Sequence, residues 1–330
     1  MSKKRVIAII LAVVVILGGI TVSSISAIVS SFISNSSSSS GDPFTEKTEQ
    51  QGSSSKRIAH LTLNGEISDE SDGGLFGGSG YDHDAFMKQL DNVKKDKSVK
   101  GVLLTINSPG GGTYPSDEIY NKIKQIKKKG KKVYVHMESL AASGGYYVSA
   151  PADKIYAGPQ SMVGSIGVIM SNVDYSGLQK KLGVKENVIK SGAHKDILSS
   201  SRPMTSDEKN ILQSMLNDSF DRFVNIVKDG RHMSEKKVRK LADGRVYSAQ
   251  QAKENGLIDN IGYQNEAISA LKKDIHAKNA EVFEYSDSGN IFSTIFSAKS
   301  TVKQFRSDIK DIKSVITNDS KAKPMYLYEG

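Results

Sequence analysis

The sequence predicts an α/β protein with parallel strands, preceded by one N-terminal transmembrane helix. Three observations support this prediction. Strand-like apolar runs alternate with helix-like segments along residues 57–275, Gly-rich segments follow several of these strands, and a long apolar run opens the chain. Repeated β-α alternation is typical of a parallel sheet covered by helices. No internal repeat is present, so we expect one large domain rather than two copies of a smaller one.

The N-terminus has the pattern of a membrane anchor. Lys3, Lys4 and Arg5 precede an apolar run that reaches about Ala27. A spanning helix needs about 20 apolar residues, which this run supplies, and the positive charges favour a cytoplasmic N-terminus. We therefore predict an uncleaved anchor in residues 1–34 of a single-pass protein of the cell membrane, with the rest of the chain extracytoplasmic. Cleavage after Ala27 is the alternative.

Residues 35–56 are rich in serine and have little to bury, so we predict a flexible tether between the anchor and the folded part. In the folded part, short apolar runs predict strands, and apolar residues at helical spacing predict helices. Ser248 caps one of these helices and Gly256 ends it. The predicted strands cover residues 58–63, 102–106 and 133–136, and the predicted helices cover residues 82–95, 115–128, 205–229, 234–241 and 248–256.

The character of the sequence changes in the C-terminal extension, residues 276–330. Over residues 302–316, apolar residues recur at spacings of three and four with Lys and Arg between them, which predicts a basic amphipathic helix. The sequence leaves open whether this helix packs on its own domain, on the membrane surface or on another subunit. The apolar-aromatic tail, residues 324–330, is either a disordered end or a segment in a groove of the protein.

Composition excludes several classes of site. The chain contains no Cys, which excludes disulfides, thiolate metal sites and a Cys nucleophile. The net charge is +9, but the Lys residues are spread widely. We therefore interpret the charge as solvated faces and attraction to an anionic membrane, with no nucleic-acid binding. The Gly-rich turn at residues 107–112 lacks the Gly-Lys-Ser/Thr ending of a nucleotide-binding loop. No cofactor and no metal site are predicted.

Two Gly-rich segments suggest acyl-transfer chemistry. Residues 107–112 follow a strand, and their three glycines let backbone N–H groups point at a ligand oxygen, as an oxyanion hole or an anion cradle, or form a plain turn. Ser143 lies among small residues at a strand-to-helix junction, with the Gly144 N–H beside its hydroxyl. No Gly-x-Ser-x-Gly elbow is present. Taken alone, the Ser143 pattern also fits close packing at a helix start.

A serine nucleophile needs a base, and His194 and Lys195 are adjacent candidates. A histidine would belong to a Ser-His-Asp triad, whereas a lysine acts as a base when burial favours its neutral form. Ser165, which lies between two glycines, can approach a buried amine and hold it by a hydrogen bond. The alternatives are a solvated charge for Lys195 and a plain turn for Ser165.

Together these pieces resemble the signal peptide peptidase A family, in its short Gram-positive form, within the Clp/crotonase superfamily. The order and spacing of the pieces make the resemblance specific, and it covers about residues 57–275. It implies a Clp/crotonase-like fold of repeated β-β-α units. The matching segments are residues 107–112, 141–147, 164–168, 191–197, 201–204, 244–247 and 256–259.

The resemblance also implies a role for each site residue. Ser143 matches the family nucleophile and Lys195 matches its general base. Ser165 matches the hydroxyl that orients the lysine, and Gly110 and Gly144 match the oxyanion-hole donors. No His lies in the region where the related Clp proteolytic subunit carries its triad His, which favours a Ser-Lys dyad.

The implied function is a membrane-anchored serine endopeptidase that degrades remnant signal peptides and other small apolar peptides at the outer face of the cytoplasmic membrane. The implied assembly is a closed homo-oligomer, an octamer, in which Lys195 reaches Ser143 of a neighbouring subunit. Two alternatives stay open, a crotonase-like acyl-CoA enzyme and a non-catalytic membrane scaffold of the stomatin-associated type. An outward-facing anchor disfavours the first, because CoA is absent outside the cell.

Overall fold

The computed structural model describes residues 44–69, 81–287 and 324–328. The described residues from Glu46 onward group into one compact unit. The predicted membrane anchor, residues 1–34, and the predicted amphipathic helix, residues 302–316, lie outside the described residues. Within the described ranges, no helix is both long enough and apolar enough to cross a membrane.

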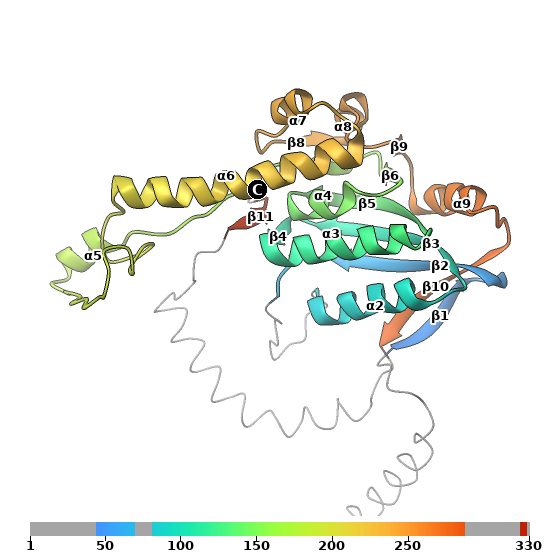
Figure 1. The fold of residues 1–330 in the computed structure, drawn as a ribbon, viewed down its shortest axis with the longest axis horizontal. Coiled ribbons are helices and arrows are strands. Elements are labelled where there is room, and N and C mark those ends of the chain that lie inside the picture. The colour runs from blue at the N-terminus through green and yellow to red at the C-terminus, as the bar shows by residue number, and fades with distance from the viewer. Residues whose placement is uncertain (1–43, 70–80, 288–323, 329–330) are drawn as a thin grey trace, which may run out of the picture. The chain divides into compact units, whose positions relative to one another are not determined.

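A mostly parallel sheet forms the centre of this unit (Figure 1). Seven strands follow one another in the order β1-β10-β2-β3-β5-β6-β9, and β7 and β8 continue from β5. Neighbours from β10 to β9 pair in parallel, β7 pairs in parallel with β5, and β8 runs antiparallel to β7. The strands are β1 (Phe44–Gln50), β2 (Ser53–Asn64), β3 (Val99–Ser108), β5 (Lys132–Ala142), β6 (Lys154–Ala157), β7 (Met162–Gly164), β8 (Val246–Ser248), β9 (Asn260–Ile261) and β10 (Ala280–Asp287).

The sheet has two buried faces. In β3, Val102 and Leu104 belong to one apolar cluster and Leu103 to another, because successive side chains point to opposite faces. Helices α2 and α3 pack on the first face, as their helical spacing predicts, and α9 covers the second face with Ile268 and Leu271. The helices are α2 (His83–Lys95), α3 (Thr113–Lys128), α4 (Gly144–Ser149), α5 (Ser176–Lys181), α6 (Ser206–Arg231), α7 (Glu235–Leu241), α8 (Ala249–Asn255) and α9 (Gln264–Asp274).

A second, two-stranded sheet forms at the end of β3. It consists of β4 (Gly110–Gly112) and β11 (Met325–Leu327), which pair antiparallel. Because β4 lies between β3 and α3, the chain has the order β-β-α at this point. The glycine turn and the C-terminal tail, far apart in sequence, are therefore neighbours in space.

Two predicted boundaries differ from the structure. The predicted tether, residues 35–56, overlaps β1 and the start of β2, and β10 extends the sheet beyond the predicted domain end at residue 275. β1 is almost entirely exposed, so its hydropathy gives no sign of a strand. A side-chain pair instead links it to β2, where Glu49 meets His60. An edge strand held by backbone bonds and polar pairs needs no apolar pattern.

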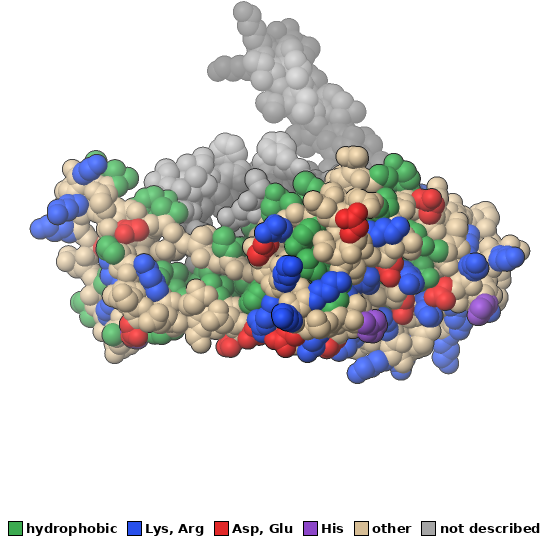
Figure 2. Space-filling model, turned by 90° about the horizontal axis from the view of Figure 1, so that it is seen from above, with side chains coloured by type: hydrophobic (Ala, Val, Ile, Leu, Met, Phe, Trp, Pro, Cys, Tyr) green, Lys and Arg blue, Asp and Glu red, His purple; other side chains and the backbone are tan. Residues whose placement is uncertain are grey.

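The segment between β7 and the second half of α6 forms an arm, which we define as residues 170–215. It contains α5, and Figure 1 shows it extending beyond the sheet at the N-terminal end of α6. The apolar side chains of α6 become buried only toward its C-terminal end, as at Phe223 and Val227. Large apolar side chains on the arm stay exposed, among them Leu182 and Ile189, and Figure 2 shows hydrophobic side chains on the surface of this projecting end.

Candidate active site

Ser143 lies where β5 ends and α4 begins, with 1% of its surface exposed. Its backbone has φ 52° and ψ −114°, a conformation that non-Gly residues rarely adopt. The Ser143 N–H donates to the Gly164 carbonyl at 2.7 Å, and the Ser143 carbonyl accepts from the Tyr147 N–H at 2.8 Å. The side chain does not cap α4. The junction therefore holds a serine in a strained, fixed backbone, which is a frequent feature of functional sites.

Gly110 and Gly144 lie against each other next to this junction. A Cβ on Gly110 would lie 2.6 Å from the Gly144 nitrogen, and a Cβ on Gly144 would lie 2.7 Å from Ser116 Oγ. Gly110 also has φ 105°, which L side chains rarely allow. Side chains are thus excluded at both positions. The structure brings the two predicted oxyanion-hole residues together with the predicted nucleophile.

The two glycines differ in how their N–H groups are used. The Gly110 N–H donates to Ser108 Oγ at 3.1 Å, so an oxyanion would have to share or replace that bond. Gly144 is the first residue of α4, where backbone N–H groups have no partner within the helix. The Gly144 N–H is therefore the more available of the two donors. Sequence reasoning missed Ser108, although it lies two positions before Gly110 in the same motif.

A groove beside the glycine turn holds an extended peptide segment, the chain's own C-terminal strand. β11 pairs antiparallel with β4, and Tyr326 lies opposite Gly111. On the other side of β11, Met325 exchanges two backbone hydrogen bonds with Ile169, at 2.9 and 3.0 Å. Of the two interpretations of the tail, the structure supports a segment in a groove. β11 is thus added as one strand between two existing segments, which is the arrangement by which a sheet edge binds an extended peptide.

An aromatic pocket in this groove surrounds Tyr326. The ring of Tyr326 stacks on Tyr147 with centroids 4.6 Å apart and contacts Phe223 at 4.9 Å, and its hydroxyl donates to the Ser219 carbonyl at 3.0 Å. The Tyr147 hydroxyl donates to Asp117 at 2.6 Å, and burial raises the pKa of Tyr147. The pocket accepts a large apolar or aromatic side chain. Sequence reasoning missed it because its walls come from α4 and α6, which are far apart in the sequence.

Ser165 belongs to the same cluster as the predicted nucleophile. Its neighbour Gly164 accepts the Ser143 N–H, and the Ser165 N–H donates to the Arg245 carbonyl at 2.8 Å. Ser165 is buried and has φ 48°, so it is also held in an unusual backbone conformation. The predicted lysine-orienting residue is therefore one position away from a direct contact of Ser143.

Lys195 lies on the arm, in an exposed turn. Its backbone N–H donates to the Gly192 carbonyl at 3.2 Å, and its side chain makes no hydrogen bond or ion pair with another described residue. Ser143, by contrast, is buried in the body of the unit. Within one chain, the structure brings the serines and glycines of the site together and leaves the predicted base apart from them.

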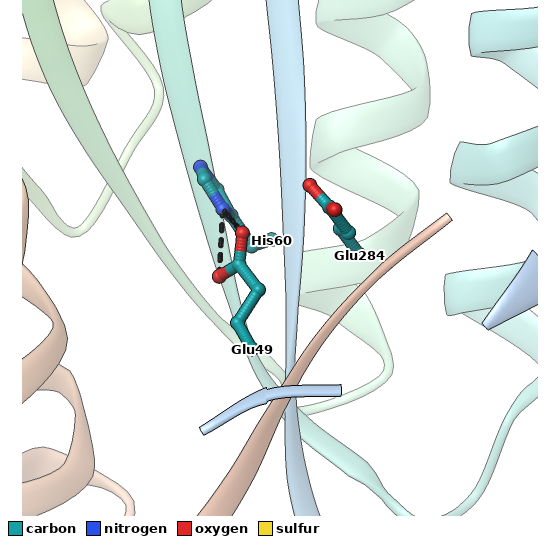
Figure 3. Close-up of side chains that lie close together, drawn as sticks. All are labelled: Glu49, His60 and Glu284. Atoms are coloured by element: carbon teal, nitrogen blue, oxygen red, sulfur yellow. Dashed lines mark hydrogen bonds and ion pairs between the residues drawn. The ribbon is translucent and has the colours of Figure 1, made fainter. Parts of the chain in front are cut away.

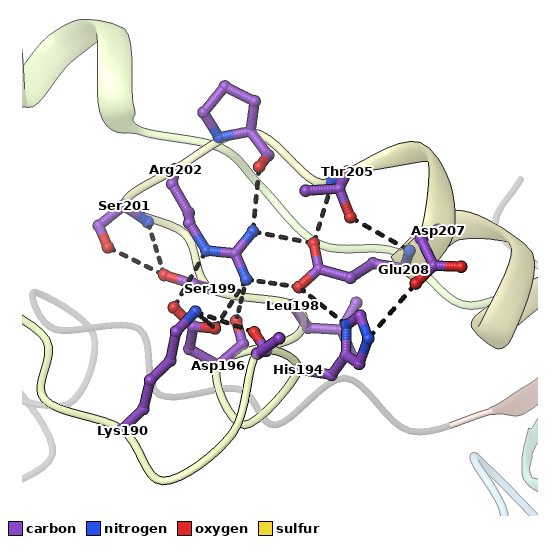
Figure 4. Close-up of polar contacts among 12 residues, drawn as sticks. Lys190, His194, Asp196, Leu198, Ser199, Ser201, Arg202, Thr205, Asp207 and Glu208 are labelled. Carbon is purple, nitrogen blue, oxygen red and sulfur yellow. Dashed lines mark hydrogen bonds and ion pairs between the residues drawn. The ribbon is translucent and has the colours of Figure 1, made fainter.

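A network of charged side chains fixes the turn that carries Lys195 (Figure 4). Arg202 donates to Asp196 at 2.7 and 3.0 Å and to Glu208 at 2.5 and 2.8 Å. Thr205 and Glu208 form the capping box of α6. The hydrogen bonds from Arg202 lower the pKa of Glu208 to about 2 and hold the pKa of Asp196 well below its usual range. Ion pairs, rather than an apolar core, therefore order this turn.

His194, the alternative base, belongs to the same network. Its ring nitrogens lie 3.4 Å from Asp207 and 3.9 Å from Glu208 (Figure 4). Like Lys195, it is exposed on the arm and makes no hydrogen bond to Ser143 within the chain. These carboxylate neighbours give His194 a structural role in the network.

Comparisons with known proteins point to one family. A family model described as "Peptidase family S49" matches residues 125–278. A second model, described as "Clp protease", matches residues 79–164. The first range contains Ser143, Ser165 and Lys195, and the second contains the glycine turn of the groove.

Individual relatives agree with the family models. The chain is 42% identical over 292 residues to the "Putative signal peptide peptidase SppA" of Enterococcus faecium, a match that covers 87% of this chain and 85% of that protein. It is 36% identical over 218 residues to "Protease 4" of Haemophilus influenzae, covering 66% of this chain and 34% of that protein. It is 29% identical over 197 residues to "Serine protease SPPA, chloroplastic" of Arabidopsis thaliana, covering 59% of this chain and 29% of that protein.

Proposed function

Because this chain belongs to peptidase family S49 and is a serine protease, we propose that it is a signal peptide peptidase in which Ser143 and Lys195 form a catalytic dyad. The family expected from the sequence is confirmed, and so is a mixed α/β fold with a mostly parallel, Clp-like sheet. One observation carries the proposal. The groove beside the glycine turn holds a strand in extended conformation, between β4 and Ile169. A substrate bound in the same way lies against the oxyanion glycines.

The proposed chemistry follows from the residue types. Ser143 Oγ attacks the peptide carbonyl while the neutral amine of Lys195 takes the hydroxyl proton. The Gly144 N–H, together with the Gly110 N–H, stabilises the oxyanion. The Lys195 ammonium then gives its proton to the leaving amine, and an acyl ester remains on Ser143. Water hydrolyses this ester with the lysine again acting as base, and the Ser165 hydroxyl orients the lysine amine by a hydrogen bond.

In this proposal, the dyad forms between neighbouring subunits of a homo-oligomer, an octamer. Lys195 lies on the arm, whose large apolar side chains include Leu182 with 70% of its surface exposed. Exposed apolar surface of this kind marks an interaction site. An arm that packs on the next subunit makes a head-to-tail contact, and such contacts form a ring when the rotation between subunits closes. Burial in that contact favours the neutral amine that a lysine base requires.

Remnant signal peptides and other small apolar peptides are the proposed substrates. The aromatic pocket around Tyr326 suits apolar side chains. A transmembrane anchor in residues 1–34 would hold the protease domain at the outer face of the cytoplasmic membrane, where such peptides are released. The positive net charge of the chain favours closeness to an anionic membrane.

A cleavage assay tests the proposed function. The full chain in detergent micelles is expected to cleave an apolar, signal-peptide-like peptide. A chain that ends at residue 323 is expected to cleave it faster, because β11 no longer fills the groove. Lys195→Ala is expected to abolish cleavage, and His194→Ala to retain it. The reverse pattern would move the base to His194, and inactivity of every form would favour the membrane scaffold. Membership of a protease family leaves the acyl-CoA enzyme without support.

A further inference from the structure

A histidine and two glutamates meet on the far edge of the main sheet, outside the proposed catalytic site (Figure 3). Glu49 comes from β1, Glu284 from β10 and His60 from β2, which are three adjacent strands. Glu284 and His60 are direct register partners. One ligand atom from each side chain can be chosen so that all three atoms lie within 4.8 Å of one another. No other group of three or more such side chains in the described part of the chain has this spacing.

The imidazole of His60 is fixed in one orientation. His60 is 7% exposed, and its Nε2 lies 2.8 Å from Oγ1 of the buried Thr105. Its Nδ1 lies 2.9 and 3.0 Å from the two carboxylate oxygens of Glu49. A hydrogen bond at the remote nitrogen is the usual way in which proteins orient a metal-binding histidine. Thr105 therefore holds the ring with Nδ1 facing the carboxylates.

Either a hydrogen atom on Nδ1 or a metal cation lies between Nδ1 and the carboxylate, because two lone pairs at such a distance repel each other. The neutral imidazole with its hydrogen on Nδ1 meets this need with a hydrogen bond, and a cation is the other way to meet it. Bonds of about 2.0–2.2 Å in a tetrahedral zinc site put neighbouring ligand atoms about 3.4 Å apart. The separations of 2.9 and 3.0 Å between Nδ1 and Glu49 are those of a hydrogen bond, and the three ligand atoms lie within 4.8 Å of one another. A cation that replaces the proton therefore needs Glu49 to move slightly outward and Glu284 to move inward, which partly exposed glutamate side chains allow.

Charge balance supports a divalent cation. The two carboxylates bring two negative charges, and in this structure the Lys47 ammonium lies 2.7 Å from Glu284. Lys47 is 69% exposed, so its flexible side chain can withdraw to solvent when a cation arrives. Glu49 and Glu284 are partly exposed, which leaves room for water molecules to complete the coordination. A 2+ ion neutralises both carboxylates at once.

A second buried imidazole, His136, lies next to this group. His136 is the register partner of Thr105 on β5. It is 5% exposed, and neither of its ring nitrogens has a hydrogen-bond partner among the described residues. Buried polar groups are nearly always paired with protein, water or an ion. His136 therefore offers two ring nitrogens beside this group that a water molecule or an ion can satisfy.

We propose that Glu49, His60 and Glu284 form a structural site for a divalent transition-metal cation, with Zn²⁺ as the best fit. An imidazole with carboxylates suits Zn²⁺ and Mn²⁺, whereas Mg²⁺ and Ca²⁺ prefer oxygen ligands alone. The affinity order of divalent metals places Zn²⁺ above Mn²⁺. The site ties the exposed edge strand β1, where the N-terminal part of the chain enters the sheet, to β2 and β10. It is independent of the proposed function and lies on strands that carry none of the proposed catalytic residues.

Metal binding to the full, untagged chain tests the proposal. After removal of metals with a chelator, isothermal titration with Zn²⁺ is expected to give one equivalent bound, with weaker binding of Mn²⁺ and none of Mg²⁺. The melting temperature is expected to rise with the Zn²⁺ concentration, because a ligand that binds only the folded state stabilises it. X-ray absorption at the zinc edge is expected to show nitrogen and oxygen ligands.

Matched variants make the test specific. Glu49→Gln/Glu284→Gln is expected to remove Zn²⁺ binding and the rise in melting temperature, and Thr105→Val to weaken binding by about 10–100-fold. Glu46→Gln, on the same strand but paired with Arg57, is the control and is expected to bind like the wild type. Circular dichroism checks that each variant is folded. The proposal is overturned if the folded double variant binds Zn²⁺ as tightly as the wild type, or if the wild type binds none.

Discussion

The two residues of the proposed dyad lie in different surroundings. Ser143 lies in the body, by which we mean the described residues outside the arm, and Lys195 lies on the arm. The body holds Ser143 in a buried junction, fixed by backbone hydrogen bonds and by glycines that leave no room for side chains. The arm holds Lys195 in an exposed turn that the ion pairs of Arg202 fix, and the arm also carries large apolar side chains that are exposed. Ser143 and the site glycines therefore meet within one chain. The arm that carries Lys195 instead exposes apolar side chains, which a second subunit can cover.

The largest expected effect tests whether the two residues of the dyad meet between chains. Ser143→Ala and Lys195→Ala are each expected to lower kcat by about 10⁴–10⁶-fold, as removal of a catalytic group that acts with others usually does. Because Lys195 is exposed, Lys195→Ala is expected to keep the melting temperature of the wild type. Co-assembly of the two inactive variants is expected to restore activity at about one site in four, if neighbouring subunits share sites.

Co-expression of the two variants, each with a different affinity tag, allows isolation of mixed assemblies by tandem purification. Assemblies of each variant alone are the control. If mixed assemblies stay inactive while the wild type is active, Ser143 and Lys195 act within one chain, and the contrast between body and arm has no catalytic meaning.

The next effect concerns the body alone. Gly144→Ala places a Cβ 2.7 Å from Ser116 Oγ and 3.1 Å from the Gly110 Cα, so the oxyanion N–H must shift. Loss of one oxyanion donor costs about 2.7–4 kcal/mol, on the order of 10²–10³-fold in kcat. Gly177→Ala on the arm is the control, since its Cβ meets nothing within 4 Å. Equal kcat values for the two variants would remove Gly144 from the proposed oxyanion hole.

A smaller effect, which depends on protein concentration, is expected from the apolar surface of the arm. Ile189→Glu places a charge on a fully exposed apolar position, and it is expected to weaken assembly without lowering the melting temperature. On dilution of the Ile189→Glu protein, the sedimentation coefficient and the cleavage activity are expected to fall together. Tyr263→Glu, at the exposed N-cap position of α9 and outside the arm, is the control. An Ile189→Glu protein that stays fully assembled would exclude this position from the subunit contact.

The same contrast explains how much could be predicted from the sequence. The helical spacing in α2 and α3 predicts two helices that the structure contains, because local periodicity determines which face is buried. The resemblance predicts Ser143, Gly144 and Ser165 as site residues because each motif that carries them is local in sequence. The structure places Ser165 beside the Ser143 junction, and the catalytic roles of these residues stay predictions.

Features that depend on distant partners could not be predicted. The pairing of the tail with the glycine turn joins Leu327 to Gly110, more than 200 positions apart, and no pattern in either segment specifies the other. β1 carries almost no buried residue, so hydropathy predicts a tether there. The cluster of Glu49, His60 and Glu284 needs the strand order, which places β10 between β1 and β2. Such contacts follow from topology rather than from local composition.

The smallest expected effect tests how the arm is ordered. Arg202→Ala removes the hydrogen bonds that hold Asp196 and Glu208, so the Lys195 turn is expected to loosen. A shift of about 1 Å in a catalytic group can cost about 10²-fold, and partial loosening is expected to cost about 10-fold in kcat. Hydrogen exchange at residues 190–203 measures the loosening. Arg239→Ala is the control, because its ion pairs with Asp221 and Glu235 lie outside the arm.

The pH dependence of hydrogen exchange in the arm is a second test of the Arg202 network. Because Arg202 lowers the pKa of Glu208 from 4.5 to about 2, the contribution of this carboxylate is fully present above pH 4.5 and is lost as the pH falls toward 2. In Arg202→Ala the pKa of Glu208 returns toward its ordinary value. As the pH is lowered, protection of the arm from hydrogen exchange is therefore expected to disappear at a higher pH than in the wild type. Exchange in the buried strand β3 is expected to stay slow in both proteins over this range. If β3 and the arm lose protection together, the arm is not a separately ordered region, and its ion pairs stabilise the whole domain.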